Sequence, residues 1–356
     1  MNKFLGKYKD NTKAKVIALI LGLAIIASIG VFSYLGIENR PVDSESGDVV
    51  QIDIEQGSST YDIGLLLEDN GLIRNLKSFR ITSKLLGYDG KYLAGCYQLS
   101  PSMSTLEIIK AIVNGDVASI IFTVVPGDRT EDIANNLSKQ GICTKEEFMN
   151  EVINGKFDYK WANDLPVGEK RFEGFLFPET YSFPVGVKVH DIVNSMLDQF
   201  DKNIDPTYYK KAKQLGYSFY EVIKIASIIE KEAKVEDERP LVASVIYNRL
   251  ADGMKLQMCS TVSYLLDDGR VNLTNQDIAI DSPYNTYKNA GLTPTPICSP
   301  SASCIEAAFN PKKTRYLYFV LSDKLDGTNK FSTNDADFER DKAKYYEAYE
   351  KANGDE

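Results

Sequence analysis

Histidine is nearly absent from this sequence, and its scarcity excludes several kinds of catalytic site. The 356 residues include one histidine, His190. One imidazole cannot build a His-rich zinc site, and a Ser-His-Asp or Cys-His mechanism would depend on this single residue in an ordinary helix-start context. We therefore expect any catalysis to rest on carboxylates and hydroxyls, with no metal and no cofactor.

Closely spaced cysteines are also missing. The five cysteines, Cys96, Cys143, Cys259, Cys298 and Cys304, contain no CxxC pair, which excludes a zinc ribbon. Because their number is odd, at least one thiol is free or paired between chains. Cys298 and Cys304 are near enough in sequence to form a disulfide, but solitary thiols that pack in the core also fit this spacing.

An excess of basic residues is the third absence. Lys and Arg number 41 against 50 Asp and Glu, which gives a net charge of −9 and argues against a nucleic-acid partner. The hydrophobic content of 43% is ample for buried cores, so wholesale disorder is excluded. The length suits about two domains once the terminal segments are set aside.

The amino-terminal region contains a long apolar run. Residues 16–37 carry no charge, and at 1.5 Å per residue they can cross a hydrocarbon core of about 30 Å. Five lysines precede the run, and mostly acids follow it, which predicts a single-pass anchor with a cytoplasmic amino terminus. The apolar core is longer than that of a signal peptide. We expect a cytoplasmic tail at 1–15, a membrane helix at 16–37 and a polar tether at 38–48.

An internal repeat with a spacing of 70 residues follows the tether. The stretch from Ile54 to Ile73 and the stretch from Val124 to Ile142 each read as a strand, a turn at glycine, a capped helix and a glycine stop. Between the copies, residues 95–99 read as a strand and 104–114 as a helix. The pattern predicts a small α+β module, for which polymer binding and a purely structural role are both open.

The stretch 221–239 (EVIKIASIIEKEAKVEDER) predicts a helix with an acid beside its apolar stripe. Glu230 lies at the edge of this stripe, where aliphatic neighbours would desolvate its carboxyl group, raise its pKa and keep it able to donate a proton. The alternative is a boundary glutamate paired with Arg239 or Lys234. Glu232 falls on the other margin of the stripe, and we expect it to have a supporting role.

Residues 172–183 (FEGFLFPETYSF) cannot form a regular helix, because glycine and proline interrupt them. Aromatic rings that stack on sugars, together with carboxylates that bind hydroxyls, would suit the wall of a carbohydrate site. A loop that fills the core is the equal alternative.

Several blocks of the sequence together resemble the MltG/YceG-like endolytic murein transglycosylases. The blocks occur in the family's order: EGFLFPETY (173–181), IASIIEKEA (225–233), VASVIYNRL (242–250), LQ (256–257), SPYNTY (282–287), GL (291–292) and YLYFV (316–320). The resemblance covers roughly residues 16–345. It implies an α+β fold with a LysM-like module at 49–120 and a catalytic domain at 121–350.

The resemblance implies cleavage of the MurNAc–GlcNAc bond of nascent peptidoglycan strands without water, which leaves 1,6-anhydro-MurNAc ends and terminates elongation. The family's catalytic glutamate matches the first acid of the Glu-Lys-Glu triplet, so the resemblance assigns the acid/base role to Glu230. Because the sugar's own C6 hydroxyl attacks, one carboxylate suffices, whereas hydrolases usually need two. The residues expected to line the substrate cleft are Glu173, Tyr181, Asn248, Gln257, Asn285 and Tyr287. The implied partners are glycan strands and the membrane, with peptidoglycan synthases as further candidates. A non-catalytic, membrane-anchored glycan-binding scaffold is the alternative.

The chain departs from the family's pattern in the loops expected around the cleft. Cys259 replaces an aspartate, residues 293–296 read TPTP in place of Pro-Pro-Gly-Pro, and residues 299–301 read SPS in place of Asn-Pro-Gly. Asn329 or Lys330 stands where the family has a histidine. Because Cys259 and Cys298 lie in departing loops, we expect these two thiols to approach one another. The departures also leave open an altered substrate preference or a reduced activity.

Overall fold

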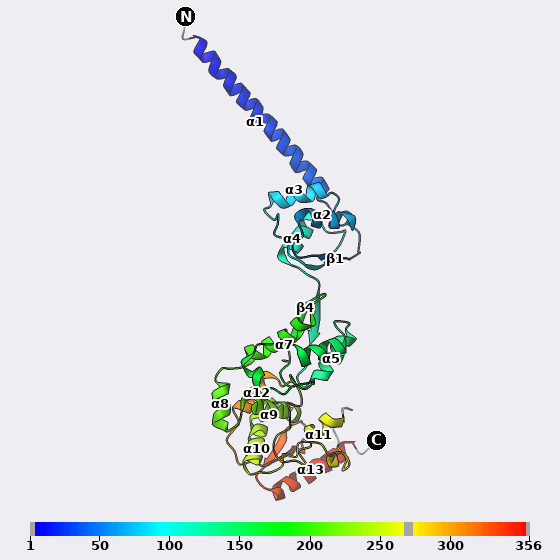
Figure 1. Ribbon diagram of the computed structural model, residues 1–356, viewed down its shortest axis with the longest axis vertical. Helices are drawn as coiled ribbons and strands as arrows, with labels where there is room; N and C mark the ends of the chain where they lie inside the picture. The colour runs from blue at the N-terminus through cyan, green and yellow to red at the C-terminus, as the bar shows by residue number, and fades with distance from the viewer. Residues whose placement is uncertain (1–3, 267–272, 354–356) are drawn as a thin grey trace. The chain divides into compact units, whose positions relative to one another are not determined.

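The contacts along the chain group it into two compact units. The computed structural model describes residues 4–266 and 273–353 (Figure 1). Unit 1 runs to Ile120 and also takes in residues 184–186, and unit 2 holds the remainder. In the described residues, helices are combined with small two-stranded sheets, so the predicted α+β class is confirmed.

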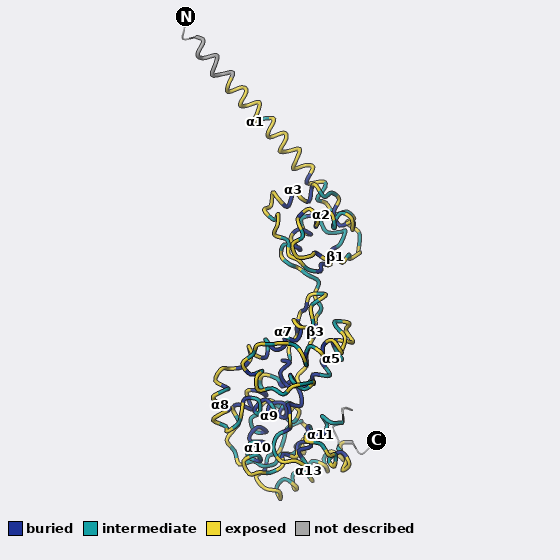
Figure 2. Tube along the Cα trace, viewed as in Figure 1, coloured by how far each residue is buried: buried dark blue, intermediate teal, exposed yellow. Residues whose placement is uncertain are grey.

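Unit 1 begins with a long apolar helix, α1, at Phe4–Glu38. Its stretch Lys13–Glu38 has a mean hydropathy of 2.7, and none of its most apolar window is buried against the protein (Figure 2). Length and composition suit a membrane-spanning helix and a signal sequence alike.

A small α+β module follows α1 in unit 1. Its elements are β1 (Val50–Ile54), α2 (Thr60–Asp69), α3 (Leu76–Leu85), β2 (Gly95–Leu99) and α4 (Thr105–Asn114). β1 and β2 pair antiparallel, from Val50 opposite Leu99 to Ile54 opposite Gly95. The apolar faces of the sheet and the three module helices meet in one core centred on Leu67, Phe79 and Tyr97.

The two copies of the repeat adopt matching local structure. Gly57 and Gly127 both have φ of +91°, in the turns that precede α2 and α5 (Thr130–Lys139). Gly71 and Gly141 both have φ of +69°, just after these helices end. A left-handed backbone favours glycine, because a Cβ atom there is strained.

Unit 2 is larger and mostly helical. One two-stranded sheet joins β3 (Ser119–Thr123) to β4 (Thr180–Pro184), and another pairs β5 (Tyr318–Leu321) with β6 (Asn329–Ser332) in antiparallel register. The helices that follow α5 are α6 (Lys145–Asn154), α7 (Val189–Asn203), α8 (Tyr208–Leu215), α9 (Phe219–Glu232), α10 (Arg239–Ala251), α11 (Cys259–Leu266), α12 (Ala302–Phe309) and α13 (Asp335–Asn353). Short 3-10 turns lie at η1 (Lys160–Asp164), η2 (Glu236–Glu238) and η3 (Asp277–Ala279).

Helix α9 runs through the core of unit 2 and contacts α8, α10, α11 and α12. Ser218 and Glu221 form a capping box at its amino terminus. Seven residues from Val222 to Ile229 are completely buried, so the helix is covered on most sides. The predicted helix at 221–239 is wrong in its length, since α9 ends at Glu232 and Ala233 is already extended. Glu230 and Glu232 therefore lie in the last turn, where neighbouring elements contact them.

Candidate active site

The carboxylate of Glu230 is held by the amino terminus of α12. Its Oε2 atom accepts hydrogen bonds from the backbone N–H of Ser301, at 2.8 Å, and from the hydroxyl of Ser301, at 2.5 Å. Ser301 is the N-cap residue of α12, and a helix amino terminus stabilises negative charge. The ion pair that the sequence left open is made elsewhere, because Arg239 pairs with Glu236 at 3.7 Å. These contacts give Glu230 a fixed, charge-stabilising environment.

Glu232, two residues after Glu230 in α9, has a different environment. Its Oε1 atom accepts a hydrogen bond from the backbone N–H of Ser260, at 3.0 Å, in the first turn of α11. The residue keeps some accessible surface, but the carboxyl group itself lies among protein atoms. Burial raises its pKa above the ordinary value, while the contacts with Ser260 oppose that rise. Glu232 therefore has a desolvated carboxyl group with a raised pKa.

A thiol and a phenol lie beside Glu232. Cys259 precedes Ser260, and its Sγ atom lies 3.0 Å from the hydroxyl of Tyr287. Burial raises the pKa of both Cys259 and Tyr287, and the charge of Glu232 raises both further, so all three groups share one electrostatic environment. Tyr287 is half-buried. Cys259 and Tyr287 thus place two hydrogen-bond donors beside an acid, Glu232, that can carry a proton.

Gln257 lies on the same loop as these groups and is held by Arg249. Its backbone has φ of +53°, uncommon for a residue with a side chain, and its N–H donates to the Thr286 carbonyl at 3.1 Å. The Arg249 guanidinium donates to the carbonyls of Leu256, at 2.7 Å, and Leu317. It also donates to Oε1 of Gln257 at 3.4 Å. Arg249 thereby fixes the loop that carries Gln257 next to Cys259.

The other predicted cleft residues are placed inside the protein. Glu173 has no exposed surface, and its carboxyl group accepts hydrogen bonds from the N–H of Thr130, at 2.9 Å, and from the hydroxyl of Tyr264, at 3.2 Å. Burial raises the pKa of Glu173. Tyr181 is buried and donates to the carbonyl of Phe177 at 2.6 Å. The aromatic loop therefore fills the core, which is the second of the two alternatives that the sequence left open.

The two predicted asparagines also bind backbone. Asn248 donates to the carbonyls of Thr314, at 3.2 Å, and Tyr316, at 2.8 Å, and so ties α10 to the segment before β5. Asn285 is fully buried and donates to the carbonyls of Ile278 and Ile280. These four residues, the two asparagines with Glu173 and Tyr181, are held by protein contacts. Tyr287 lies near Glu232, and Gln257 lies two residues before Cys259 on the segment that leads into α11.

All five cysteines are free thiols. The expected approach of Cys259 and Cys298 is not found as a bond: Cys259 contacts Tyr287, whereas Cys298 donates to the carbonyl of Ser227 at 3.3 Å. Cys298 and Cys304 are both buried in the core. Of the two alternatives for this pair, solitary thiols that pack in the core is therefore the correct one.

Two of the departures from the family's pattern make specific contacts. Ser301, in the place of a glycine, supplies the hydroxyl that binds Glu230. Asn329 donates to Glu238 from its side chain, at 2.8 Å, and from its backbone, at 2.9 Å, and so joins β6 to η2. Neither residue is near enough in sequence to its partner for the pairing to be predicted from the chain.

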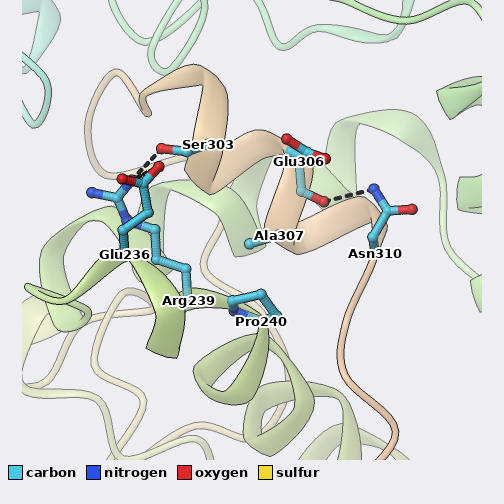
Figure 3. A pocket seen from close by; sticks show the side chains of 7 residues that line it. All are labelled: Glu236, Arg239, Pro240, Ser303, Glu306, Ala307 and Asn310. Carbon is cyan, nitrogen blue, oxygen red and sulfur yellow. Dashed lines mark hydrogen bonds and ion pairs between the residues drawn. The ribbon is translucent and has the colours of Figure 1, made fainter. Parts of the chain in front are cut away.

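A small pocket opens between η2–α10 and α12, on the side where Arg239 contacts Ser303 (Figure 3). Glu236 and Ser303 point toward the Arg239 guanidinium, and Glu306 and Asn310 line the far side. Its volume is about 170 Å³, below the roughly 300 Å³ of ordinary ligand pockets. Neither Glu230 nor Glu232 lines this pocket. Across residues 4–266 and 273–353, no cluster of three or more His, Cys, Asp or Glu is arranged to hold a metal ion.

Comparison with known proteins decides the family. The profile of the YceG-like family matches residues 52–344, which is most of the chain. This chain belongs to the YceG-like family. The matched region includes the whole of α9 and both glutamates.

Two similar proteins from different bacteria share a name. A protein from Streptococcus pneumoniae named endolytic murein transglycosylase is 33% identical over 94% of this chain. The match takes in 66% of that relative, so the chain spans just under two thirds of its length. A protein of the same name from Bacillus subtilis is 34% identical, over 89% of this chain and 90% of the relative. The crystal structure of a putative YceG-like protein from Listeria monocytogenes aligns with a TM-score of 0.56 and 32% identity, over 83% of this chain and 99% of the other.

Sequence reasoning placed residues 299–301 in a departing loop, but it did not predict that Ser301 binds Glu230 or that Ser260 binds Glu232. The Glu-Lys-Glu triplet contains both acids, and helical periodicity places both on margins of the apolar stripe. The signal that separates them is the partner of each carboxylate, which comes from α11 for Glu232 and from α12 for Glu230.

Proposed function

We propose that this YceG-like chain is an endolytic lytic transglycosylase of peptidoglycan. It cleaves the MurNAc–GlcNAc bond of nascent glycan strands, leaves 1,6-anhydro-MurNAc ends and so terminates elongation. Membership of the family and the names of the relatives support this substrate class. The observation that carries the chemistry is the desolvated carboxyl group of Glu232 beside Tyr287 and Cys259.

Glu232, rather than Glu230, is the acid/base in this proposal. Catalysis begins with a protonated carboxyl group, and burial raises the pKa of Glu232 toward the pH at which such a group keeps its proton. Glu230 is already engaged by two hydrogen bonds from Ser301, which fix the position of its carboxyl group. The assignment of Glu230 stays a prediction from the sequence, and the experiment below compares the two residues directly.

The reaction needs one carboxyl group in two successive roles. Glu232 first donates its proton to the glycosidic oxygen as the bond to C1 breaks, and the GlcNAc end leaves as an alcohol. The C6 hydroxyl of MurNAc then attacks C1, and its proton passes to the Glu232 carboxylate. The acid is restored, and no water is consumed. The Tyr287 hydroxyl, kept protonated by a raised pKa, is placed to donate a hydrogen bond to the substrate near this carboxyl group.

Gln257 and Tyr287 are the two residues to which we assign substrate contact, because both lie with Glu232 on exposed or half-buried surface. For Glu173, Tyr181, Asn248 and Asn285, the cleft assignment remains a sequence prediction, and their internal hydrogen bonds favour structural roles. Helix α1 serves in this proposal as a membrane anchor with its amino terminus in the cytoplasm, so the catalytic unit is extracytoplasmic. Peptidoglycan synthases, which make the strands, are the natural partners of such an enzyme.

The test compares full-length Glu232→Gln and Glu230→Gln with the unaltered chain on purified glycan strands. Mass spectrometry of the products counts anhydro-MurNAc ends. General acid–base catalysis contributes roughly 10²–10⁴-fold, so Glu232→Gln should lose that factor. Glu230→Gln should keep most activity at a temperature where it is folded. If Glu230→Gln alone abolishes the products, the assignment between the two acids is reversed. If no chain forms anhydro ends, the non-catalytic scaffold is the correct alternative.

A further inference from the structure

Helix α3 of unit 1 carries a surface that combines bases with apolar side chains. Its buried face consists of Ser78, Phe79, Thr82 and Ser83, which point into the core of the module. The opposite face exposes Lys77, Arg80, Ile81, Lys84 and Leu85, spaced three or four residues apart so that they share one side of the helix. Leu86, which follows the helix end, is exposed as well. We call these six residues the α3 face.

The charge of this region is unusual for the chain. Residues 70–88 contain four bases and no acid, whereas the whole chain has a net charge of −9. Among the residues that the structure describes, Lys77, Arg80 and Lys84 form no ion pair. Arg80 lies over the ring of Tyr61 at 5.5 Å, and the fourth base, Arg74, donates to the carbonyls of Pro41 and Val42. The three bases of the α3 face are therefore available to an external anion.

The apolar members of the α3 face are well exposed. Leu85 has 60%, Leu86 47% and Ile81 41% of its surface accessible. A single exposed apolar residue is ordinary on a protein surface, but Ile81 and Leu85, one helical turn apart and bordered by bases, are typical of helices that lie in a membrane interface. Long basic side chains there can extend to lipid head groups while apolar residues enter the acyl boundary.

Helix α3 is fixed at the carboxyl end of α1. Helix α1 packs on α3 at its carboxyl end, where Leu35 is buried. The side chain of Asn39, one residue past α1, donates to Thr82 Oγ1 at 2.8 Å and accepts from Ser78 Oγ at 3.2 Å. Arg74 then holds the chain that leaves α1 through two backbone carbonyls. Within unit 1, α3 lies across the end of α1 with no long tether between them (Figure 1).

We propose that the α3 face docks on the surface of the membrane that α1 spans, and that anionic lipid head groups bind Lys77, Arg80 and Lys84. This inference rests on the proposed role of α1 as an anchor. A helix fixed at the end of a transmembrane span is at the depth of the head groups, so its basic and apolar residues meet their complement there. The module is then seated on the bilayer and keeps a set orientation to it, rather than moving freely on a flexible tether.

The experiment places a photo-crosslinking amino acid at Leu85 of the full-length chain in vesicles of phosphatidylcholine with or without phosphatidylglycerol. The matched control carries the same group at Val167 of unit 2, which is 95% exposed. Crosslinking to lipid at position 85 should exceed that at position 167 several-fold and should increase with phosphatidylglycerol. The variant Lys77→Glu/Arg80→Glu/Lys84→Glu should lose this excess, whereas Lys77→Arg/Arg80→Lys/Lys84→Arg should keep it.

Each outcome decides between the proposals. Equal lipid crosslinking at positions 85 and 167, in a chain that resists alkaline carbonate extraction, overturns the docking and leaves the anchor intact. Release of the chain by carbonate overturns both. Crosslinked dimers in place of lipid adducts show that a second copy covers the face. Formation of anhydro-MurNAc ends is measured on the same samples, so a failure of the proposed activity is recognised separately.

Discussion

Replacing Glu230 by glutamine should lower the stability of unit 2, whereas replacing Glu232 should not. Both side chains lie in the last turn of α9, and both substitutions preserve size and hydrogen-bonding capacity. They differ in how the surrounding protein acts on the carboxylate charge that each substitution removes. At Glu230 the charge receives two hydrogen bonds from Ser301 at the amino terminus of α12, and at Glu232 it is opposed by burial.

The size of the Glu230 effect follows from these contacts. A hydrogen bond to a charged group contributes roughly 1.5–3 kcal/mol, against about 1 kcal/mol for a neutral one. A charge at a helix amino terminus contributes roughly 0.3–1 kcal/mol more. Because Glu230 is half-buried, solvent screens part of this, and we expect Glu230→Gln to lose about 1–2 kcal/mol. For a unit of this size, that corresponds to a fall in Tm of about 2–8 °C.

The effect of Glu232 on stability depends on pH. Its pKa is raised in the folded state, so its contribution to stability is fully present below the unfolded pKa of about 4.3 and is lost as pH rises through the folded pKa. Glutamine does not ionise and avoids this loss. Glu232→Gln should therefore match the unaltered chain in acid and unfold at a higher temperature in alkali.

Differential scanning calorimetry of the full-length chain in detergent, at several pH values, measures both effects. Glu236→Gln is a matched control, because the Glu236 side chain is 75% exposed and its ion pair with Arg239 should contribute less than about 0.5 kcal/mol. The reasoning is refuted if Glu230→Gln leaves Tm unchanged while Glu232→Gln lowers it at neutral pH.

Three further predictions concern the surroundings of the two glutamates. Activity should fall as pH rises through the raised pKa of Glu232. Cys259→Asp should move this fall to higher pH, because a second negative charge favours the protonated acid, whereas Cys259→Ser should leave it in place. A pH–rate profile of the three chains tests this, and an unmoved profile in Cys259→Asp would contradict it. Asn329→Ala removes a donor to the Glu238 carboxylate and should lower stability by about 1–2 kcal/mol in a thermal scan, whereas an unchanged Tm would contradict the bridge between β6 and η2. Gln257→Gly should be about 0.5–1.5 kcal/mol more stable than Gln257→Ala in denaturant titrations, because only glycine relieves the left-handed backbone; equal stabilities would contradict that strain.

Local features of the fold could be predicted from the sequence because short-range physics determines them. The glycines at 57 and 127, and those at 71 and 141, mark turns and helix ends wherever the backbone must be left-handed. The strand predicted at residues 95–99 is β2 with the same bounds. The carboxyl end of α9 could not be predicted, because residues 233–239 have helical propensity and the chain instead turns to begin α10.

The roles of polar side chains needed the three-dimensional partners. Glu230 and Glu232 look equivalent in a helical projection, and the difference between them comes from Ser301, 71 residues away, and Ser260, 28 residues away. Glu173 and Asn285 occur in motifs of the family, but a motif does not tell whether a side chain faces a ligand or the core. Both side chains are fully buried and bind other groups of the protein.

The central claim is that Glu232 transfers protons in a reaction that consumes no water. The direct measurement is mass spectrometry of the glycan ends that the full-length chain forms in isotopically labelled water. The account predicts anhydro-MurNAc ends that contain no label and that are lost in Glu232→Gln but retained in Glu230→Gln. Labelled reducing MurNAc ends from the unaltered chain, or anhydro ends that persist in Glu232→Gln, would contradict it.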